Sequence, residues 1–166
     1  REARSIGLQQ VLKKARFPKY KIPQTLLEVK RRLGLKIRDE VAPFHDMDRV
    51  LFSLSQKYDL GIVSSNSESN IKNFLEKHHF LDYFNYIHSD SSLFGKHAVL
   101  RRFCRKYKVK AADLTFIGDE DRDIQAARKM NIKVIAVTWG YNDKGLLEKE
   151  KPDHLVDRPG EILELL

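Results

Sequence analysis

The sequence is poor in several features that mark particular classes of protein. It has one cysteine, Cys104, so it cannot form an internal disulfide, which suits a reducing cytoplasm. No apolar run approaches the ~18 residues of a membrane-spanning helix, and no signal-like segment follows the charged start at Arg1. A Walker loop, a dinucleotide fingerprint and zinc-type ligand spacing are also missing. These absences disfavour membrane, secreted and zinc proteins, and Cys104 is expected to be a buried structural thiol.

Acidic residues are scarce only in the N-terminal part of the chain. Residues 1–58 hold 14 Lys and Arg against 6 Asp and Glu, whereas residues 59–166 hold 17 of each kind. Such an asymmetry is compatible with binding to nucleic acid or a membrane surface, or with attraction of an anionic substrate. The basic residues are spread along helical patterns and form no continuous block, so a solvated helix face is an equally good interpretation.

The hydrophobic pattern changes near residue 41. Before it, apolar residues at helical spacing predict helices over 5–15 and over 23–34, the second opened by Pro23 and closed by Gly34. After it, short apolar strands alternate with helices: strands at 60–65, 83–89, 114–120, 134–140 and 154–157, and helices at 47–57, 69–79, 96–107, 123–130 and 161–166. This alternation predicts an α/β fold, a Rossmann-like, doubly wound parallel sheet whose ligands bind at the carboxyl ends of its strands.

Four carboxylates follow one of these strands in the segment FIGDEDRDI, residues 116–124. Gly118 lets the chain turn, Asp119 lies at the carboxyl end of the strand, and Asp123 follows four residues later at the start of a helix. Two carboxylates at this spacing suit Mg²⁺, which typically takes one or two of them together with waters and a substrate phosphate. An acidic helix N-terminus stabilised by the helix dipole is the simpler interpretation, which we prefer for Glu120 and Asp121.

Two further segments carry groups that suit a phosphate. Ser65 and Asn66 follow the strand in GIVSSNS, where the free N–H groups of the next helix also point. Serine and asparagine are ordinary turn residues, so this pattern alone is weak. Lys96 follows Gly95 at the first turn of a helix, where a cation opposes the helix dipole. It is either an exposed lysine or one whose charge is compensated by a phosphoryl group and the carboxylates.

Taken together, these segments resemble three motifs of the haloacid dehalogenase superfamily, particularly its phosphoglycolate-phosphatase-like branch. The second motif, a strand ending in Ser or Thr, is similar to Ser65 in IVSSN, and the third, a lysine before a helix, is similar to Lys96 in LFGKHAVL. The fourth, GDxxxD, is similar to GDEDRD with Asp119 and Asp123. The three motifs occur in the family's order and spacing.

The resemblance implies a chemistry for these residues. It implies a Mg²⁺-dependent phosphatase that hydrolyses a small phosphomonoester through an aspartyl-phosphate. Ser65 and Lys96 would hold and neutralise the transferring phosphoryl group, with Asn66 assisting, while Asp119 and Asp123 would hold the metal directly or through water.

The family's first motif, a strand followed by D-x-D, supplies the nucleophile and has no match here. Asp46 and Asp48 have the right spacing in FHDMDRVLF, but they follow Pro43 and Phe44 instead of an apolar strand. Asp46 is better explained as the N-cap of the helix at 47–57, and Asp48 as an acid in its first turn. We therefore expect the nucleophile upstream of Arg1, and this chain to be inactive by itself.

The resemblance also predicts the domain organisation and the partners. Residues 1–40 are expected to be part of a helical cap, and residues 41–166 a haloacid dehalogenase-like core that lacks its first strand. The expected partner is a small phosphorylated metabolite bound by a cytoplasmic monomer or homodimer, with no membrane contact and no recognisable nucleic-acid motif. The alternative is a non-catalytic phosphate-binding protein, or a basic nucleic-acid-binding protein, of the same fold.

Overall fold

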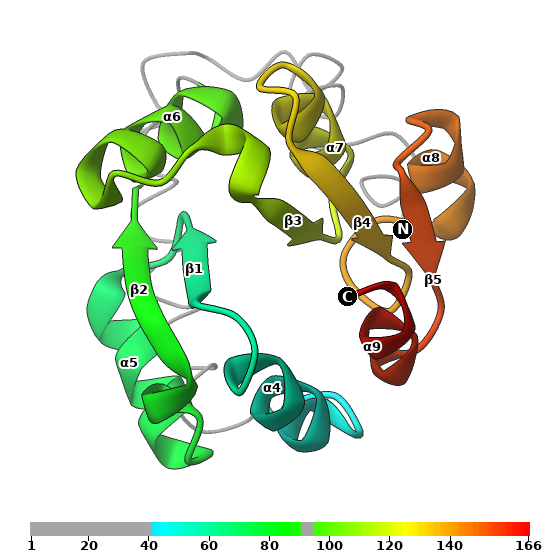
Figure 1. Cartoon of the computed structure of the whole chain (residues 1–166). Helices are drawn as coiled ribbons and strands as arrows, with labels where there is room; N and C mark the ends of the chain where they lie inside the picture. The colour runs from blue at the N-terminus through cyan, green and yellow to red at the C-terminus, as the bar shows by residue number, and fades with distance from the viewer. Residues whose placement is uncertain (1–40, 91–94) are drawn as a thin grey trace, which may run out of the picture. The chain divides into compact units, whose positions relative to one another are not determined.

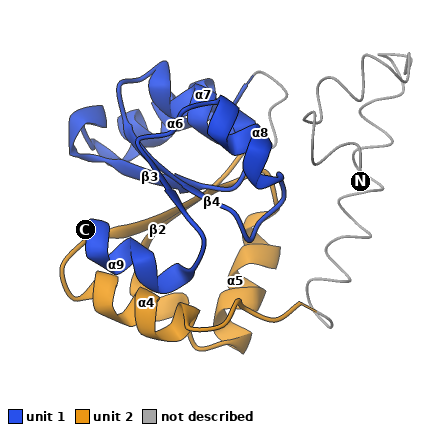
Figure 2. Ribbon diagram, turned by 90° about the vertical axis from the view of Figure 1, so that its right-hand side faces the viewer, with its two compact units in different colours: residues 1–15, 92–166 blue, residues 16–91 orange. Residues whose placement is uncertain are grey.

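The computed structural model describes residues 41–90 and 95–166, which belong to two compact units. The helices predicted at 5–15 and 23–34, and with them the predicted cap, lie outside the described residues. Figure 2 shows the two units in different colours, with residues 41–90 in orange and residues 95–166 in blue.

The unit 41–90 contains one parallel β-α-β arrangement preceded by a helix. Its elements are α4 (Met47–Ser55), β1 (Leu60–Ser64), α5 (Glu68–Lys77), a 3₁₀ turn (Leu81–Tyr83) and β2 (Phe84–Ser89). Strands β1 and β2 pair in parallel, with an irregularity between Leu60 and Gly61 and with Ile62 opposite Ile87. Ile71 and Leu75 on α5 and Phe80 beyond it form the buried centre of this unit. The strand, helix and strand therefore have the parallel crossover that the sequence pattern predicts.

The unit 95–166 extends the same alternation. Its elements are α6 (Lys96–Tyr107), β3 (Thr115–Gly118), α7 (Asp121–Arg128), β4 (Lys133–Val137), α8 (Lys144–Lys149), β5 (His154–Val156) and α9 (Ile162–Leu165), with 3₁₀ turns at Ala111–Asp113 and Pro159–Glu161. The strands form a parallel sheet in the order β3-β4-β5. Helices α6, α7 and α8 lie on one side of this sheet and α9 on the other (Figures 1 and 2). The α/β parallel architecture is thus confirmed.

The core of the unit 95–166 forms around β4. Four of the five residues of β4 are buried, and Ile135 and Ala136 are completely inaccessible. Ile124 and Ala127 on α7, together with Leu147 on α8, are also fully buried. A central parallel strand that is covered on both faces typically has a continuous apolar sequence, and β4 has this pattern in KVIAV. This packing fixes the carboxyl ends of β3 and β4 beside each other.

Three local expectations need correction. Asp46 occupies the N-cap position of α4, but it has a left-handed backbone (φ 64°) and its side chain makes no capping hydrogen bond. The carboxylate instead pairs with His45 at 3.1 Å. Helix α8 is absent from the predicted elements, because six residues that include Gly145 give too short a pattern to recognise. Cys104 is only half-buried, and burial raises the pKa of its thiol.

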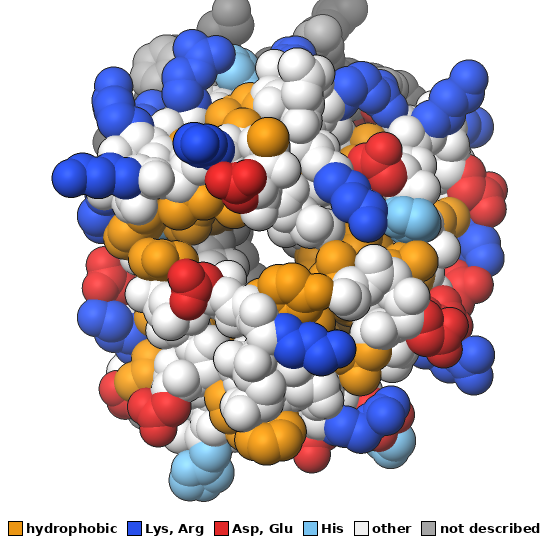
Figure 3. All heavy atoms as spheres, viewed as in Figure 1, with side chains coloured by type: hydrophobic (Ala, Val, Ile, Leu, Met, Phe, Trp, Pro, Cys, Tyr) orange, Lys and Arg blue, Asp and Glu red, His pale blue; other side chains and the backbone are white. Residues whose placement is uncertain are grey.

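No helix in the described parts of the chain is long and apolar enough to cross a membrane. Lys and Arg side chains are spread over the face in Figure 3, several of them at the upper left, where Figure 1 places α6. On that helix Arg101, Arg105 and Lys106 are exposed, opposite the buried Val99 and Phe103. The basic side chains here form the solvated face of a helix whose other face is core.

Candidate active site

Strand β3 and helix α7 deliver the two carboxylates to one place. Strand β3 ends at Gly118, Asp119 follows, and α7 begins at Asp121, so Asp123 lies in the first helical turn. Asp123 is almost fully buried, and its Oδ2 accepts hydrogen bonds from the backbone N–H groups of Asp119 and Glu120, both at 3.2 Å. Glu120 completes a reciprocal capping box with it. Asp123 therefore holds the turn in which Asp119 lies.

Lys96 pairs with the other oxygen of Asp123. Its Nζ contacts Asp123 Oδ1, and its side chain is only 22% exposed. Burial raises the pKa of the Asp123 carboxyl above its ordinary value, while the charge of Lys96 and their hydrogen bond act in the opposite direction. The interpretation of Lys96 as an exposed lysine is therefore wrong, because a carboxylate compensates its charge at the start of α6.

The glycine before Lys96 is required by the backbone. Gly95 has a positive φ of 84°, and a Cβ atom there would also come within 3.1 Å of the His97 ring. Glycine adopts this conformation without the steric cost that other residues meet. Lys96 also lies over the Phe116 ring, with Nζ 5.7 Å from the ring centroid, so the lysine side chain bridges α6 and β3.

The loop after β4 closes over Asp119, and reasoning from the sequence misses this contribution. The backbone N–H of Tyr141 donates to Asp119 Oδ2 at 2.7 Å, and that of Asn142 donates to the Asp119 carbonyl at 3.1 Å. Gly140 lies so close that an added Cβ would be 2.1 Å from the Cβ of Asp119. The only signal in the sequence is a Gly and an Asn just after a strand that neighbours β3.

The chemistry of these residues fits a magnesium ion. Asp119 keeps Oδ1 without a hydrogen bond from any described residue, whereas both oxygens of Asp123 already have partners. No group of three or more His, Cys, Asp or Glu side chains capable of holding a metal occurs within 41–90 and 95–166. Mg²⁺ does not need such a cage, since it usually keeps several waters and takes one or two protein carboxylates. Asp119 is suited to direct contact, and Asp123 to contact through water.

Ser65 and Asn66 follow the carboxyl end of β1 in the other unit. Ser65 is exposed, while Asn66 Oδ1 accepts from the Ser67 N–H at 2.9 Å and from Asn70 Nδ2 at 3.0 Å. Ser67 caps α5 by accepting the N–H of Asn70 at 3.2 Å. The structure thus brings Lys96, Asp119 and Asp123 together, and the participation of Ser65 and Asn66 in the same site stays a prediction.

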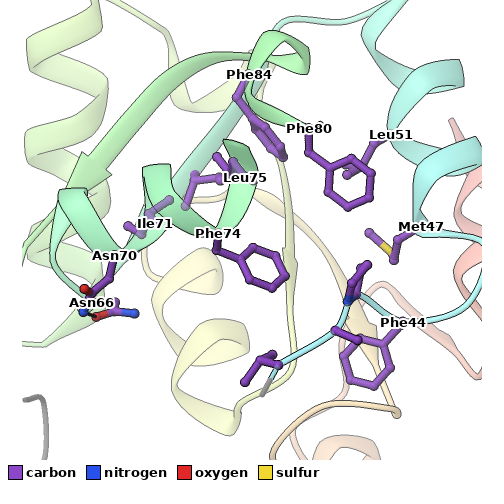
Figure 4. A pocket seen from close by; sticks show the side chains of 14 residues that line it. Phe44, Met47, Leu51, Asn66, Asn70, Ile71, Phe74, Leu75, Phe80 and Phe84 are labelled. Atoms are coloured by element: carbon purple, nitrogen blue, oxygen red, sulfur yellow. Dashed lines mark hydrogen bonds between the residues drawn. The ribbon is translucent and has the colours of Figure 1, made fainter. Parts of the chain in front are cut away.

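An apolar pocket of about 400 Å³ adjoins Asn66 within the unit 41–90. Figure 4 shows Asn66 and Asn70 beside each other at one end and the rings of Phe44, Phe74 and Phe80 along the rest. The described residues that line it are Val41, Ala42, Pro43, Phe44, Met47, Leu51, Ile62, Asn66, Asn70, Ile71, Phe74, Leu75, Phe80 and Phe84. Among the described residues that line it, the two asparagines are the polar ones.

Comparison with models of known protein families shows the family of this chain. Residues 2–137 match the model of the haloacid dehalogenase-like hydrolase family. The chain belongs to this family. Solved structures share its fold: a "predicted phosphatase" from Clostridium acetobutylicum superposes with a TM-score of 0.82 at 22% identity, covering 94% of this chain and 76% of that one. A haloacid dehalogenase-like family hydrolase from Streptococcus pneumoniae gives 0.78 at 23%, covering 90% and 71%.

Several curated relatives of this haloacid dehalogenase-like chain are phosphoglycolate phosphatases. A phosphoglycolate phosphatase of Synechococcus elongatus is 34% identical over 105 residues, which are 63% of this chain and 50% of that protein. A phosphoglycolate phosphatase of Pectobacterium atrosepticum is 38% identical over 61 residues, 37% of this chain and 26% of the relative. The chain therefore spans about half the length, or less, of these relatives.

Proposed function

We propose that this chain is the core part of a Mg²⁺-dependent phosphatase acting on a small phosphomonoester such as phosphoglycolate. One observation carries the proposal: a buried Asp123 paired with Lys96 lies one turn from Asp119 at the end of a parallel strand. A buried ion pair is costly to maintain, and at the carboxyl end of a sheet it is a reasonable sign of a functional site. The phosphoglycolate phosphatases among its relatives support the substrate class.

Each residue has a role in this proposal. Asp119 would hold Mg²⁺ directly and Asp123 through water, and the bound ion would supply stabilisation of the charge that develops on the phosphoryl oxygens. Lys96 would neutralise a phosphoryl oxygen with the positive charge that Asp123 now balances. Ser65 would donate its hydroxyl and Asn66 its amide to the same phosphoryl group, as the resemblance implies.

The nucleophile of the proposed reaction is a carboxylate upstream of residue 1. Asp46 and Asp48 lie at the start of α4, and no strand within 41–46 precedes them, so they do not follow a strand as that motif requires. The proposed intermediate is an aspartyl-phosphate on that upstream carboxylate, and the cytoplasm is the proposed location because the chain has a single cysteine.

The test uses the full-length protein and the substitution Asp119→Asn. We expect turnover of phosphoglycolate to fall at least ~100-fold and Mg²⁺ affinity to weaken, since charge stabilisation by a metal is worth several kcal/mol. Asp121→Asn is the matched control, because it removes a carboxylate of the same cluster whose one hydrogen bond from a described residue comes from the N–H of Arg122. Wild-type turnover that persists in excess chelator would contradict the metal requirement.

The alternative, a non-catalytic phosphate-binding protein of the same fold, predicts a different result. Such a protein would bind phosphate with Lys96 and Ser65 but would release none from any phosphomonoester, even at full length. A screen of phosphorylated metabolites with the full-length protein separates the two possibilities, because turnover of even one compound excludes the alternative.

A further inference from the structure

Asp119 is held by a segment from a different part of the chain, the loop 139–142 that follows β4. Strands β3 and β4 pair in parallel with Gly118 opposite Ala136, so this loop leaves the sheet beside the turn that contains Asp119. Tyr141 donates its N–H to Asp119 Oδ2 at 2.7 Å. One carboxylate oxygen is thereby occupied, and the other keeps its capacity as a ligand.

Asn142 anchors this loop at two points. Its side chain is completely buried, and Oδ1 accepts the N–H of Asp121 at 2.8 Å. Its own N–H donates to the Asp119 carbonyl at 3.1 Å. Among the described residues, Asn142 and Asp123 are the two buried polar side chains, and both attach to the turn 119–121. Burying an amide is costly unless it is hydrogen-bonded, so the hydrogen bond from Asp121 is needed to keep the Asn142 side chain buried.

Gly140 determines how closely the loop approaches. A Cβ atom at this position would lie 2.1 Å from Asp119 Cβ and 2.2 Å from its Oδ2. Real Cβ atoms do not come so close to another heavy atom, so any larger residue would displace the Asp119 carboxylate. The close approach puts the N–H of Tyr141 within hydrogen-bonding distance of Asp119.

We infer that Asn142 and Gly140 are positioning residues that orient Asp119 so that it offers one oxygen, Oδ1, to a metal ion. The inference rests on the proposed function, and it adds a property that this function does not require: discrimination between metals. Mg²⁺ demands near-ideal octahedral geometry, whereas Ca²⁺ accepts flexible and bidentate carboxylates. A carboxylate with one oxygen fixed to the backbone suits Mg²⁺.

The experiment measures the dissociation constants of Mg²⁺ and Ca²⁺ by calorimetry on the full-length protein. Asn142→Ala and Gly140→Ala are each expected to weaken Mg²⁺ binding ~10- to 100-fold, the usual effect of disturbing groups that orient a metal ligand. Ca²⁺ binding should change much less, so the preference for Mg²⁺ over Ca²⁺ shrinks. Gly140→Ala leaves the Asn142 side chain in place, so the two variants disturb Asp119 independently.

Val134→Ala is the control for a loss of stability alone. Val134 is buried at the opposite end of β4, away from the loop, so this variant should lower the melting temperature without changing the ratio of the two metal affinities. If Asn142→Ala and Gly140→Ala weaken both metals equally, or neither, the loop only stabilises the fold and the inference is wrong.

Asp119→Asn separates failure of this inference from failure of the proposed function. The inference is overturned, and the function stands, if Asp119→Asn abolishes Mg²⁺ binding while both loop variants bind Mg²⁺ as the wild type does. A wild-type protein that binds no Mg²⁺ overturns both.

Discussion

The two units use the same β-α-β construction but differ in how completely they cover their strands. In the unit 95–166, four of the five residues of β4 are buried, whereas in the unit 41–90 no residue of β1 is fully buried. The apolar pocket of about 400 Å³ also lies in the unit 41–90. Parallel strands are normally covered on both faces. The comparison indicates that Lys96, Asp119 and Asp123 are held by a well-covered unit, and that the described strands of the unit 41–90 are less completely covered.

Strands β1 and β3 each lie at the edge of a described sheet. Among the described residues, β1 pairs with β2 alone and β3 with β4 alone, so each has one unpaired edge. An unpaired edge in a core leaves backbone groups without partners. The upstream strand that ends in the nucleophile stays a prediction.

The largest effect is expected from the presence or absence of the upstream segment. These 166 residues alone should bind Mg²⁺ weakly and show no phosphatase turnover, because Ser65 and Lys96 stabilise charge but cannot replace a carboxylate nucleophile. Release of inorganic phosphate from phosphoglycolate is the measurement, with the full-length protein as the positive control. Robust hydrolysis by the 166 residues would mean that the nucleophile lies within them, and Asp46 would be the first to test.

Amide hydrogen exchange would sharpen the comparison between the units. In the full-length protein the amides of β1 (Leu60–Ser64) and β3 (Thr115–Gly118) should exchange far more slowly than in the 166-residue chain. Each buried backbone group without a partner costs about 1–3 kcal/mol, and an added strand would satisfy several. Strand β4 is the internal control, since both of its edges are already paired. Equal protection of β1 in the two proteins would argue against an additional strand.

A smaller effect is expected from the buried ion pair of the unit 95–166. Lys96→Ala leaves the Asp123 carboxylate buried without its partner, so it should lower the free energy of unfolding by about 3–5 kcal/mol. The double variant Lys96→Ala with Asp123→Asn should recover part of this loss, because the uncompensated charge is gone. Urea denaturation of the full-length protein is the measurement.

The control for that ion pair is Lys144→Ala. Lys144 pairs with Asp157 at 2.8 Å, but both side chains are about half exposed, so water replaces the lost contact. If Lys96→Ala and Lys144→Ala had the same free energy of unfolding, the burial of Asp123 would not increase the contribution of its ion pair to stability.

The sequence predicts those parts of the fold and site that depend on local patterns. Helix α6 begins and ends at its predicted residues because its apolar spacing is strong, and Asp119 and Asp123 are found through a strand end and a four-residue spacing. The roles of Gly140 and Asn142 cannot be read in this way, because they depend on which strand lies beside β3. Such non-local pairing has no signature in the residues of the loop itself.

The N-cap prediction for Asp46 is right in position, but the side chain does not make the expected hydrogen bond, for a related reason. An aspartate before an apolar helical pattern is typically an N-cap. Here the backbone at Asp46 is left-handed, with φ of 64°, and the side chain makes no capping hydrogen bond. Ser67, before α5, has an extended backbone and does accept the Asn70 N–H. The residue type favours a cap, but the direction in which the chain enters the helix determines whether one forms.

The smallest effect concerns the base of the loop 139–142 and acidic pH. Thr138 precedes this loop, and its Oγ1 donates to Asp157 Oδ1 at 2.8 Å, while Lys144 Nζ contacts Oδ2 of the same carboxylate. Hydrogen bonds from Lys144 and then Thr138 hold the pKa of Asp157 below its ordinary value of 3.8. The folded state therefore binds this proton less readily than the unfolded state does. Its contribution to stability is fully present above the ordinary pKa and is lost as pH falls through the lowered one.

Asp157→Asn should therefore lower the melting temperature slightly at neutral pH and make it fall less steeply below about pH 4. The shift should be small because the carboxylate is exposed and water screens its interactions. Asp113→Asn, which removes an exposed carboxylate at the other end of β3, is the control and should leave the slope as in the wild type. Thermal unfolding followed by circular dichroism between about pH 3 and pH 7 measures both variants. A slope unchanged by Asp157→Asn would show that the ties at the base of the loop add nothing to stability, and would leave Asn142 as its principal anchor.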